Sequence, residues 1–139
     1  MDQVFLDASI LVSVAWNPKS VLRDLWQVDT ARLFTSSLAA NEARANLVVP
    51  WRKQGLEGLL GEVTIAAFDV NPASKVPESV QLRAKDRPIL GAAIALQATH
   101  LITSDLRDFG PYFGQLLCGV LILHPAEYLK RKGIWRGRP

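Results

Sequence analysis

The chain has 139 residues, of which 49% are hydrophobic and 21% charged, and its net charge is +3. This size and balance fit one globular domain with its own core and exclude a disordered chain or a disulfide-stabilised scaffold. The first apolar run has no basic leader and is too short for a secretory core, and no apolar stretch is long enough to cross a bilayer. We therefore expect a single domain over residues 1–139, cytoplasmic and without a membrane partner.

Strand-like and helix-like patterns alternate along the chain. Strands are predicted at residues 3–6, 31–35, 63–68, 100–103 and 120–123. Helices are predicted at residues 9–16 and 21–27, from Ser36 or Ser37 through Glu42, from Pro50 to about Gly61, from Pro77 or Glu78 to Asp86, at 87–97, and from Pro125 onward. The segment at 87–97 is apolar nearly all round, which predicts a buried helix. This alternation predicts an α/β fold, a parallel sheet of about five strands with helices on both faces.

Three of four candidate acids sit at a strand end or a helix start, where an open α/β sheet places its ligand crevice. Asp7 ends the first strand, Asp105 follows the strand at 100–103, and Asp86 opens the apolar helix. Glu42 lies about two helical turns beyond the second strand. Carboxylates gathered at one crevice repel one another unless a hard divalent cation shares them. The pattern therefore points to Mg²⁺ or Mn²⁺ and to phosphoryl chemistry.

Taken singly, each of these acids has a structural alternative. Asp7 and Asp86 stand where helix caps are common, although Ser9 is also available to cap the helix after Asp7. Glu42 has the alternative of a surface acid paired with a base one turn away.

Other polar residues near strand ends also have a catalytic and a structural interpretation. Asp105 and Asp108 lie three residues apart, and we favour Asp105 as the ligand because it is nearer the strand end. Asp69 also follows a strand, but its surroundings have the composition of a turn. His100 and His124 lack the spacing of metal ligands and are predicted to be structural.

Four stretches in order resemble the PIN-domain family, and within it the bacterial VapC-like branch. They are Leu6-Asp7-Ala8-Ser9, Ser36-Ser37 with Glu42 five residues on, Lys85-Asp86-Arg87-Pro88-Ile89-Leu90, and Thr103-Ser104-Asp105-Leu106-Arg107-Asp108-Phe109. The ending from Val120 to Leu129 is similar to the last strand and helix of that family. The likeness covers almost the whole chain. It departs at Ser9, where many relatives carry Asn, but it loses none of the acids.

The resemblance implies a three-layer α/β/α PIN-like domain with a central parallel sheet. It implies a metal-dependent endoribonuclease, using Mg²⁺ or Mn²⁺ on an RNA substrate, as the toxin of a toxin–antitoxin pair. An antitoxin partner and a homodimer are part of that expectation.

On the matching motifs, the acidic quartet consists of Asp7, Glu42, Asp86 and Asp105. Asp7, Asp86 and Asp105 are the expected metal ligands, and Glu42 is expected to position or deprotonate the attacking water. Asp108 is expected to assist, and Thr103 or Ser104 to orient the Asp105 carboxylate or a water. Among basic residues, the expected phosphate contacts are Arg44, Lys85 and Arg87.

Two other functions stay open. One is a catalytically silent PIN-fold module that binds RNA or a partner. The other is a phosphotransfer domain or phosphatase, which requires a second acid close to its nucleophilic Asp and a lysine after a later strand. Asp7 has no acid two residues on, and no lysine directly follows the strand that ends at Thr103, so we favour the nuclease.

Three further features have two interpretations each. Cys118 is the only cysteine and is predicted to be a small buried side chain rather than a reactive thiol. The basic tail, about 130–139, carries a tryptophan among its positive charges. One prediction is that the tail binds a phosphate backbone and stacks a base; the alternative is a flexible terminus. Trp16, Trp26 and Trp51 are each predicted to fill the core, with a dimer or partner face as the alternative.

Overall fold

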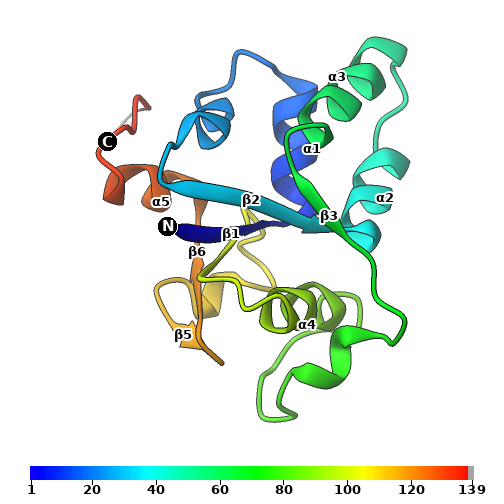
Figure 1. Ribbon diagram of the computed structural model, residues 1–139, viewed down its shortest axis with the longest axis vertical. Helices are drawn as coiled ribbons and strands as arrows, with labels where there is room; N and C mark the ends of the chain where they lie inside the picture. The colour runs from blue at the N-terminus through cyan, green and yellow to red at the C-terminus, as the bar shows by residue number, and fades with distance from the viewer. Residues whose placement is uncertain (138–139) are drawn as a thin grey trace.

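The computed structural model describes residues 1–137, and its centre is a six-stranded sheet with the strand order β3-β2-β1-β4-β6-β5 (Figure 1). The strands are β1 (Asp2–Leu6), β2 (Ala31–Ser36), β3 (Thr64–Ala66), β4 (His100–Ile102), β5 (Leu116–Leu117) and β6 (Val120–Leu123). All neighbours are parallel except β5 and β6. In the central register, Phe5 lies opposite both Phe34 and Leu101.

Helices cover both faces of this sheet, which confirms the predicted three-layer architecture. They are α1 (Ala8–Trp16), α2 (Ser37–Ala45), α3 (Pro50–Leu60), α4 (Arg87–Ala95) and α5 (Pro125–Arg131), with short 3-10 helices η1 (Val21–Gln27), η2 (Pro72–Lys75) and η3 (Gly110–Tyr112). In Figure 1, α1, α2 and α3 lie together on one side of the strands and α4 lies on the other. No helix within residues 1–137 is long and apolar enough to span a membrane.

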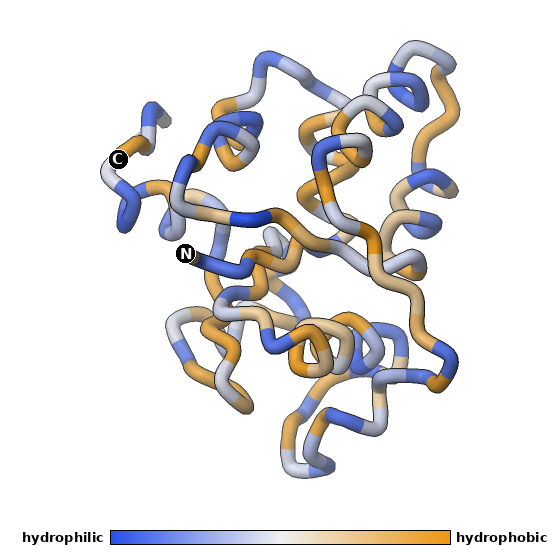
Figure 2. Tube along the Cα trace, viewed as in Figure 1, coloured by the Kyte–Doolittle hydropathy of each residue, from blue (hydrophilic) through white to orange (hydrophobic). Residues whose placement is uncertain are grey.

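The core follows from the apolar central strands. Val4, Phe5 and Leu6 are fully buried because β1 has a strand on each side and helices on both faces. The middle of α4, from Ile89 to Ala93, is buried as well, as its nearly uniform apolar sequence predicts. Figure 2 shows hydrophobic residues along the strands and the inner sides of the helices, with hydrophilic residues toward loops and helix ends.

The predicted helix at 77–86 is wrong, because this segment consists of turns and irregular chain. The Arg87 guanidinium binds the carbonyl oxygens of Val76, Pro77 and Val80. A helix over this segment needs its carbonyls for its own amides, so the arginine stabilises the irregular path instead.

The end of the sheet also differs from the prediction, because the sequence patterns missed β5. Leu117 pairs with Val120, which leaves a two-residue turn at Cys118 and Gly119 with φ angles of 50° and 85°. Positive φ at both positions is the geometry of a type I′ hairpin turn. A turn tip faces solvent, so Cys118 is exposed and the prediction of a buried thiol is wrong.

Two of the three early tryptophans also contradict their predicted core positions. Trp16 and Trp51 are 54% and 53% exposed, because they lie on the outer sides of α1 and α3. Trp26 is partly buried, and its indole N–H donates to the carbonyl of Leu59 at 3.2 Å.

The basic tail is packed against the domain over the part that the structure describes. Lys132 pairs with Asp2 at 2.8 Å, and Arg136 pairs with Asp24 at 2.6 Å. These two cations neutralise acids at the start of β1 and in η1. Arg138, which the sequence analysis counted among the basic residues of the tail, lies outside the described residues.

The contact of α4 with η2 generates a stability prediction. A Cβ at Gly91 would overlap the backbone carbonyl of Pro72, so Gly91→Ala is expected to lower the free energy of unfolding by about 1–3 kcal/mol. Gly55→Ala is the control, because Gly55 lies inside α3 with no heavy atom near the added Cβ. It is expected to stabilise by about 0.5–1 kcal/mol. Urea denaturation measures both, and equal effects would contradict the close packing of α4 on η2.

Candidate active site

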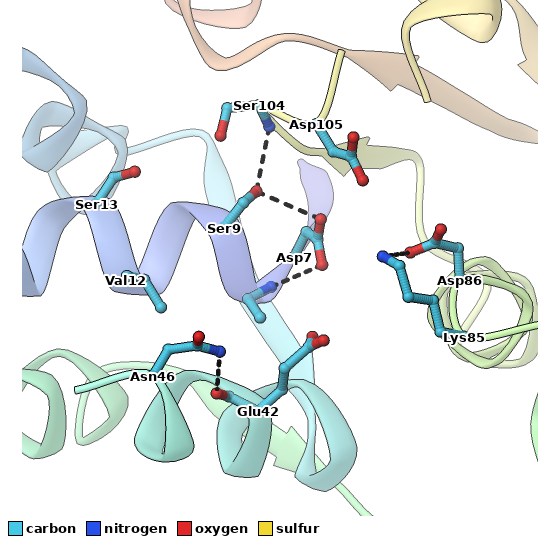
Figure 3. Close-up of a pocket in the computed structure, with 11 residues that line it drawn as sticks. Asp7, Ser9, Val12, Ser13, Glu42, Asn46, Lys85, Asp86, Ser104 and Asp105 are labelled. Carbon is cyan, nitrogen blue, oxygen red and sulfur yellow. Dashed lines mark hydrogen bonds and ion pairs between the residues drawn. The ribbon is translucent and has the colours of Figure 1, made fainter. Parts of the chain in front are cut away.

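The acidic quartet predicted from the sequence lines one cavity of about 460 Å³ (Figure 3). Asp7 and Asp105 follow the carboxyl ends of β1 and β4, which are neighbours in the sheet. Glu42 projects from α2, and Asp86 stands at the start of α4. We call this space the acidic cavity. It lies at the carboxyl edge of a parallel sheet, where α/β proteins place their ligand sites.

Asp7 is both a helix cap and a wall of the acidic cavity. Its Oδ1 accepts a hydrogen bond from the Ala8 N–H at 2.7 Å, which caps α1. Its Oδ2 accepts from the hydroxyl of Thr103 at 2.7 Å and from that of Ser9 at 3.3 Å. Burial raises the pKa of the Asp7 carboxyl, the Thr103 and Ala8 donors oppose that rise, and the charge of Glu42 adds to it. The carboxylate is therefore fixed in direction and needs compensation when ionised.

Thr103 and Ser9 connect the strand ends beneath the cavity. The buried Thr103 hydroxyl donates to Asp7 and accepts from the Asp105 N–H at 3.1 Å. The Ser9 hydroxyl accepts from the Ser104 N–H at 3.2 Å. Thr103 thus orients the Asp7 carboxylate and the Asp105 backbone, whereas the sequence predicted that Thr103 or Ser104 orients the Asp105 carboxylate or a water. Ser9 joins the first turn of α1 to the segment after β4, and the cap of α1 is Asp7.

A second group of acids overlaps the quartet. Asp86, Asp105 and Asp108 each offer a carboxylate oxygen, and these oxygens lie within 4.8 Å of one another. We call this the three-acid cluster. Asp105 Oδ1 also accepts the Asp108 N–H at 3.1 Å, which holds the loop in place. Asp7 lines the same cavity but is not one of these three residues; the third is Asp108, which the sequence predicted only to assist.

Asp86 is the least compensated member of the three-acid cluster. Its Oδ1 accepts from the ammonium of Lys85 at 3.0 Å, but its buried Oδ2 has no hydrogen-bond partner within residues 1–137. Burial raises the pKa of Asp86 to about 6, and the neighbouring ammonium opposes the rise. Although Asp86 holds the cap position of α4, its side chain makes no capping bond. A buried acceptor without a donor costs free energy unless a ligand satisfies it.

Asp108 is held by two cations. The Arg83 guanidinium makes a bidentate pair with it, at 2.7 to 3.1 Å, and the Lys85 ammonium lies 3.5 Å away. Arg83 holds the pKa of Asp108 well below its usual range. Arg83 is not predicted from the sequence, where its position three residues before Asp86 is the only indication of a role.

Glu42 differs from the other acids because it is exposed, and its carboxylate accepts no hydrogen bond from residues 1–137. The alternative of a surface ion pair does not apply, since the nearby Arg44 pairs with Glu57 at 2.8 Å. Asn46 donates only to the backbone carbonyl of Glu42. In Figure 3 the Glu42 side chain points toward the space between Asp7 and Lys85. It is thus free to accept a proton from a molecule in the cavity.

The donor set fits a hard divalent cation. All the candidate ligands are carboxylate oxygens, which Mg²⁺ and Mn²⁺ prefer. The unpartnered Asp86 oxygen and the short spacing of the three-acid cluster supply the place for such an ion. Of the three predicted phosphate contacts, Lys85 lines the cavity, whereas Arg44 and Arg87 do not.

The raised pKa of Asp86 generates a prediction about stability and pH. A carboxyl whose pKa is higher in the folded state binds its proton more tightly there, so its contribution to stability falls as pH rises from about 4 to above 6. In EDTA, Asp86→Asn is therefore expected to melt above the wild type at pH 7.5 and close to it at pH 4. Mn²⁺ is expected to raise the melting temperature of the wild type and to have less effect on the variant.

Asp69→Asn is the control for this comparison, because Asp69 is an exposed acid outside the cavity. Its free energy of unfolding is expected to lie within about 0.5 kcal/mol of the wild-type value at both pH values. A wild-type melting temperature that does not respond to Mn²⁺ would contradict the metal site. A lower melting temperature for Asp86→Asn at pH 7.5 would contradict the cost assigned to this carboxylate.

Solved structures of VapBC and VapC proteins are similar to this chain over most of its length. The structure of VapBC2 from Rickettsia felis, bound to a DNA fragment from its promoter, is 16% identical with a TM-score of 0.68, covering 88% of this chain and 98% of that one. DNA-bound VapBC from Salmonella typhimurium is 19% identical with a TM-score of 0.67, covering 90% and 99%. VapC20 from Mycobacterium tuberculosis, a toxin that cleaves the sarcin–ricin loop, is 12% identical with a TM-score of 0.57, covering 75% and 91%.

The sequence comparisons add nothing to these matches: no protein-family model and no curated protein sequence matches this chain. At identities below 20%, the likeness to the three structures concerns the fold. It extends over most of this chain and nearly the whole of each matched chain. The predicted architecture is thereby confirmed, and the protein has the VapC-like PIN-domain fold.

Proposed function

We propose that this protein is a metal-dependent endoribonuclease that hydrolyses RNA phosphodiester bonds, acting in the cytoplasm as a single domain over residues 1–139. The observation that carries the proposal is the convergence of the four acids on one cavity, at the carboxyl edge of a sheet with the VapC-like fold. A similar fold is found in VapC20, a toxin that cleaves the sarcin–ricin loop. The buried Asp86 oxygen without a donor, close to carboxylate oxygens of Asp105 and Asp108, supports the binding of a cation there.

Each acid of the cavity would have a role set by its burial and its hydrogen-bond partners. Asp86 and Asp105, with Asp108 or Asp7, would hold the divalent ion, whose chemistry is to acidify a water and to stabilise negative charge on the leaving oxygen. Asp7 is fixed by its three donors, so it would hold its position as the substrate enters. Lys85 would offset part of the negative charge at the cavity rim and contact a phosphate oxygen.

Glu42 would act as the general base. Its carboxylate is exposed and unpaired, so it would accept the proton of the attacking water within the cavity. The water oxygen bonds to phosphorus, the bond from phosphorus to the leaving ribose oxygen breaks, and that oxygen takes a proton from solvent. The products are two shorter RNA chains, which is the balance of a simple hydrolysis.

Cleavage of RNA tests the proposal directly. Total RNA is incubated with the wild type in Mn²⁺ or EDTA, and with Asp86→Asn and Asp69→Asn in Mn²⁺. Cleavage is expected only with metal, and Asp86→Asn is expected to reduce its rate by about 100-fold or more, since it removes a charge from the cavity. Asp69→Asn is expected to cleave at the wild-type rate. Equal cleavage by all four samples would indicate a contaminating nuclease, and RNA binding without cleavage would favour a silent binding module.

We also propose that the protein is the toxin of a toxin–antitoxin pair and therefore has protein partners. The supporting observation is that the matched structures from Rickettsia felis and Salmonella typhimurium are VapBC structures. We expect an antitoxin partner and a homodimer. Overproduction is expected to slow bacterial growth, and co-expression of a neighbouring reading frame to restore it. Asp86→Asn produced at the same level is expected to be harmless, whereas normal growth with a folded, RNA-cleaving wild type would contradict the toxin role.

A further inference from the structure

The solvent-facing side of α1 forms a path that leaves the acidic cavity. The inner side of the helix is buried: Ala8, Ile10, Leu11, Val14 and Ala15. The outer side carries residues at the helical spacing i, i+3, i+4 and i+7, which are Ser9, Val12, Ser13 and Trp16. The first three line the acidic cavity, and Trp16 lies one turn farther along the same stripe. Figure 3 shows Val12 and Ser13 on α1 leading away from the acids.

This path ends at two exposed tryptophans that hold an arginine between them. The guanidinium carbon of Arg52 lies 3.5 Å from the ring centre of Trp16 and 4.8 Å from that of Trp51. Arg52 Nε also donates to the backbone carbonyl of Trp16 at 3.2 Å. We call these three side chains the tryptophan platform. Over the nine residues from Asp7 to Trp16, the helix rises about 13 Å, so the platform lies a short distance from the acids.

The charge of the platform suits a phosphate-bearing ligand. Arg52 forms no ion pair with any carboxylate in residues 1–137, unlike Arg44 or Arg83. Next to the rings is a hollow of about 480 Å³, lined by Trp16, Asn17, Pro18, Lys19, Trp51 and Arg52. Lys19 likewise has no ion pair within the described chain. The hollow thus combines aromatic faces with two uncompensated positive charges and contains no acid.

Exposed aromatic rings beside free cations are the chemistry that binds single-stranded nucleic acid, because any base can stack on a ring while the cation contacts its phosphate. A protein partner would also use tryptophan and arginine. The choice of RNA rests on the positive charge of the hollow, which no acid lines, and on the stripe of α1 that joins the platform to the acidic cavity through Ser9, Val12 and Ser13. Trp26, by contrast, is partly buried with its N–H bonded, as a structural tryptophan is expected to be.

We propose that Trp16, Trp51 and Arg52 form a stacking subsite for an unpaired base of the RNA whose scissile phosphodiester lies in the acidic cavity. This rests on the proposed function, and it makes the substrate class a strand that is single-stranded beside the cleavage point. The strand lies along the outer side of α1, between the acids and the platform. The platform binds the substrate and takes no part in the chemical step.

The test is the affinity of a fluorescently labelled, single-stranded RNA of about ten nucleotides, measured in EDTA so that no cleavage occurs. Loss of one stacked base is expected to weaken binding about fivefold or more in Trp16→Ala and in Trp51→Ala. Trp16→Phe keeps an aromatic face and is expected to lie between Trp16→Ala and the wild type. Arg52→Gln is expected to weaken binding and to reduce its dependence on salt.

Trp26→Phe is the matched control. Trp26 also lies near a cation, with the Arg23 guanidinium carbon 5.4 Å from its ring centre, but it is partly buried and its N–H is bonded within the domain. Its replacement is expected to leave RNA affinity unchanged, and thermal melting checks that every variant is folded. Folded Trp16→Ala and Trp51→Ala proteins with wild-type affinity would overturn the proposal, as would a loss of affinity confined to Trp26→Phe. Unchanged RNA affinity together with loss of a dimer or of an antitoxin complex would assign the platform to a protein partner.

The two proposals fail separately. If the wild type binds RNA through the platform but cleaves nothing in Mn²⁺, the stacking subsite stands and the nuclease assignment fails. If the wild type cleaves RNA while Trp16→Ala and Trp51→Ala bind and cleave as it does, only the subsite is refuted.

Discussion

The hydrogen bond from the Thr103 hydroxyl to the buried Asp7 carboxylate is the contact on which the rest of the site depends. It joins the ends of β1 and β4, the two strands at the middle of the sheet. The same hydroxyl holds the backbone of Asp105, and the other oxygen of Asp7 caps α1. One carboxylate therefore fixes the direction of a helix, the end of a strand and the loop that carries a second acid. A hydrogen bond to a charged acceptor is stronger than one between neutral groups, so the bond from Thr103 to the Asp7 carboxylate can hold these elements together.

Around this fixed point, the charges of the site are only partly balanced. Asp108 has Arg83 and Lys85 beside it, whereas one oxygen of Asp86 is buried without a donor. Groups that are costly to bury are tolerated at functional sites because the rest of the fold supplies the missing stability. Here that support comes from the fully buried strands and from α4, whose first residue follows Asp86 directly. The unpartnered oxygen of Asp86 thus lowers the stability of the fold at the place where a bound cation would restore it.

Much of the fold could be predicted because local patterns agree with it. Strand ends and helix starts are visible in the sequence, so the positions of Asp7 and Asp105 follow from the pattern of a parallel sheet. What could not be predicted depends on contacts between distant residues or on a side chain's surroundings. The segment at 77–86 follows the reach of the Arg87 side chain, which periodicity does not report. The exposure of Cys118 comes from a two-residue turn, and that of Trp16 from its place on the outer side of α1. The close approach of Asp108 to Asp86 likewise depends on how two loops meet.

The parallel order of the central strands also determines when the acidic cavity can assemble during synthesis of the chain. Asp7 and Thr103 are 96 positions apart, and β1 lacks one of its two neighbours until β4 has been made. At about 5–20 residues per second, the ribosome needs roughly 5 to 20 seconds to extend the chain from the first residue to the second. During that interval Glu42 and then Asp86 are added, but Asp105 and the loop that carries it are still missing from the cavity wall. The acidic cavity therefore forms only near the end of translation, and a prematurely terminated chain cannot assemble it.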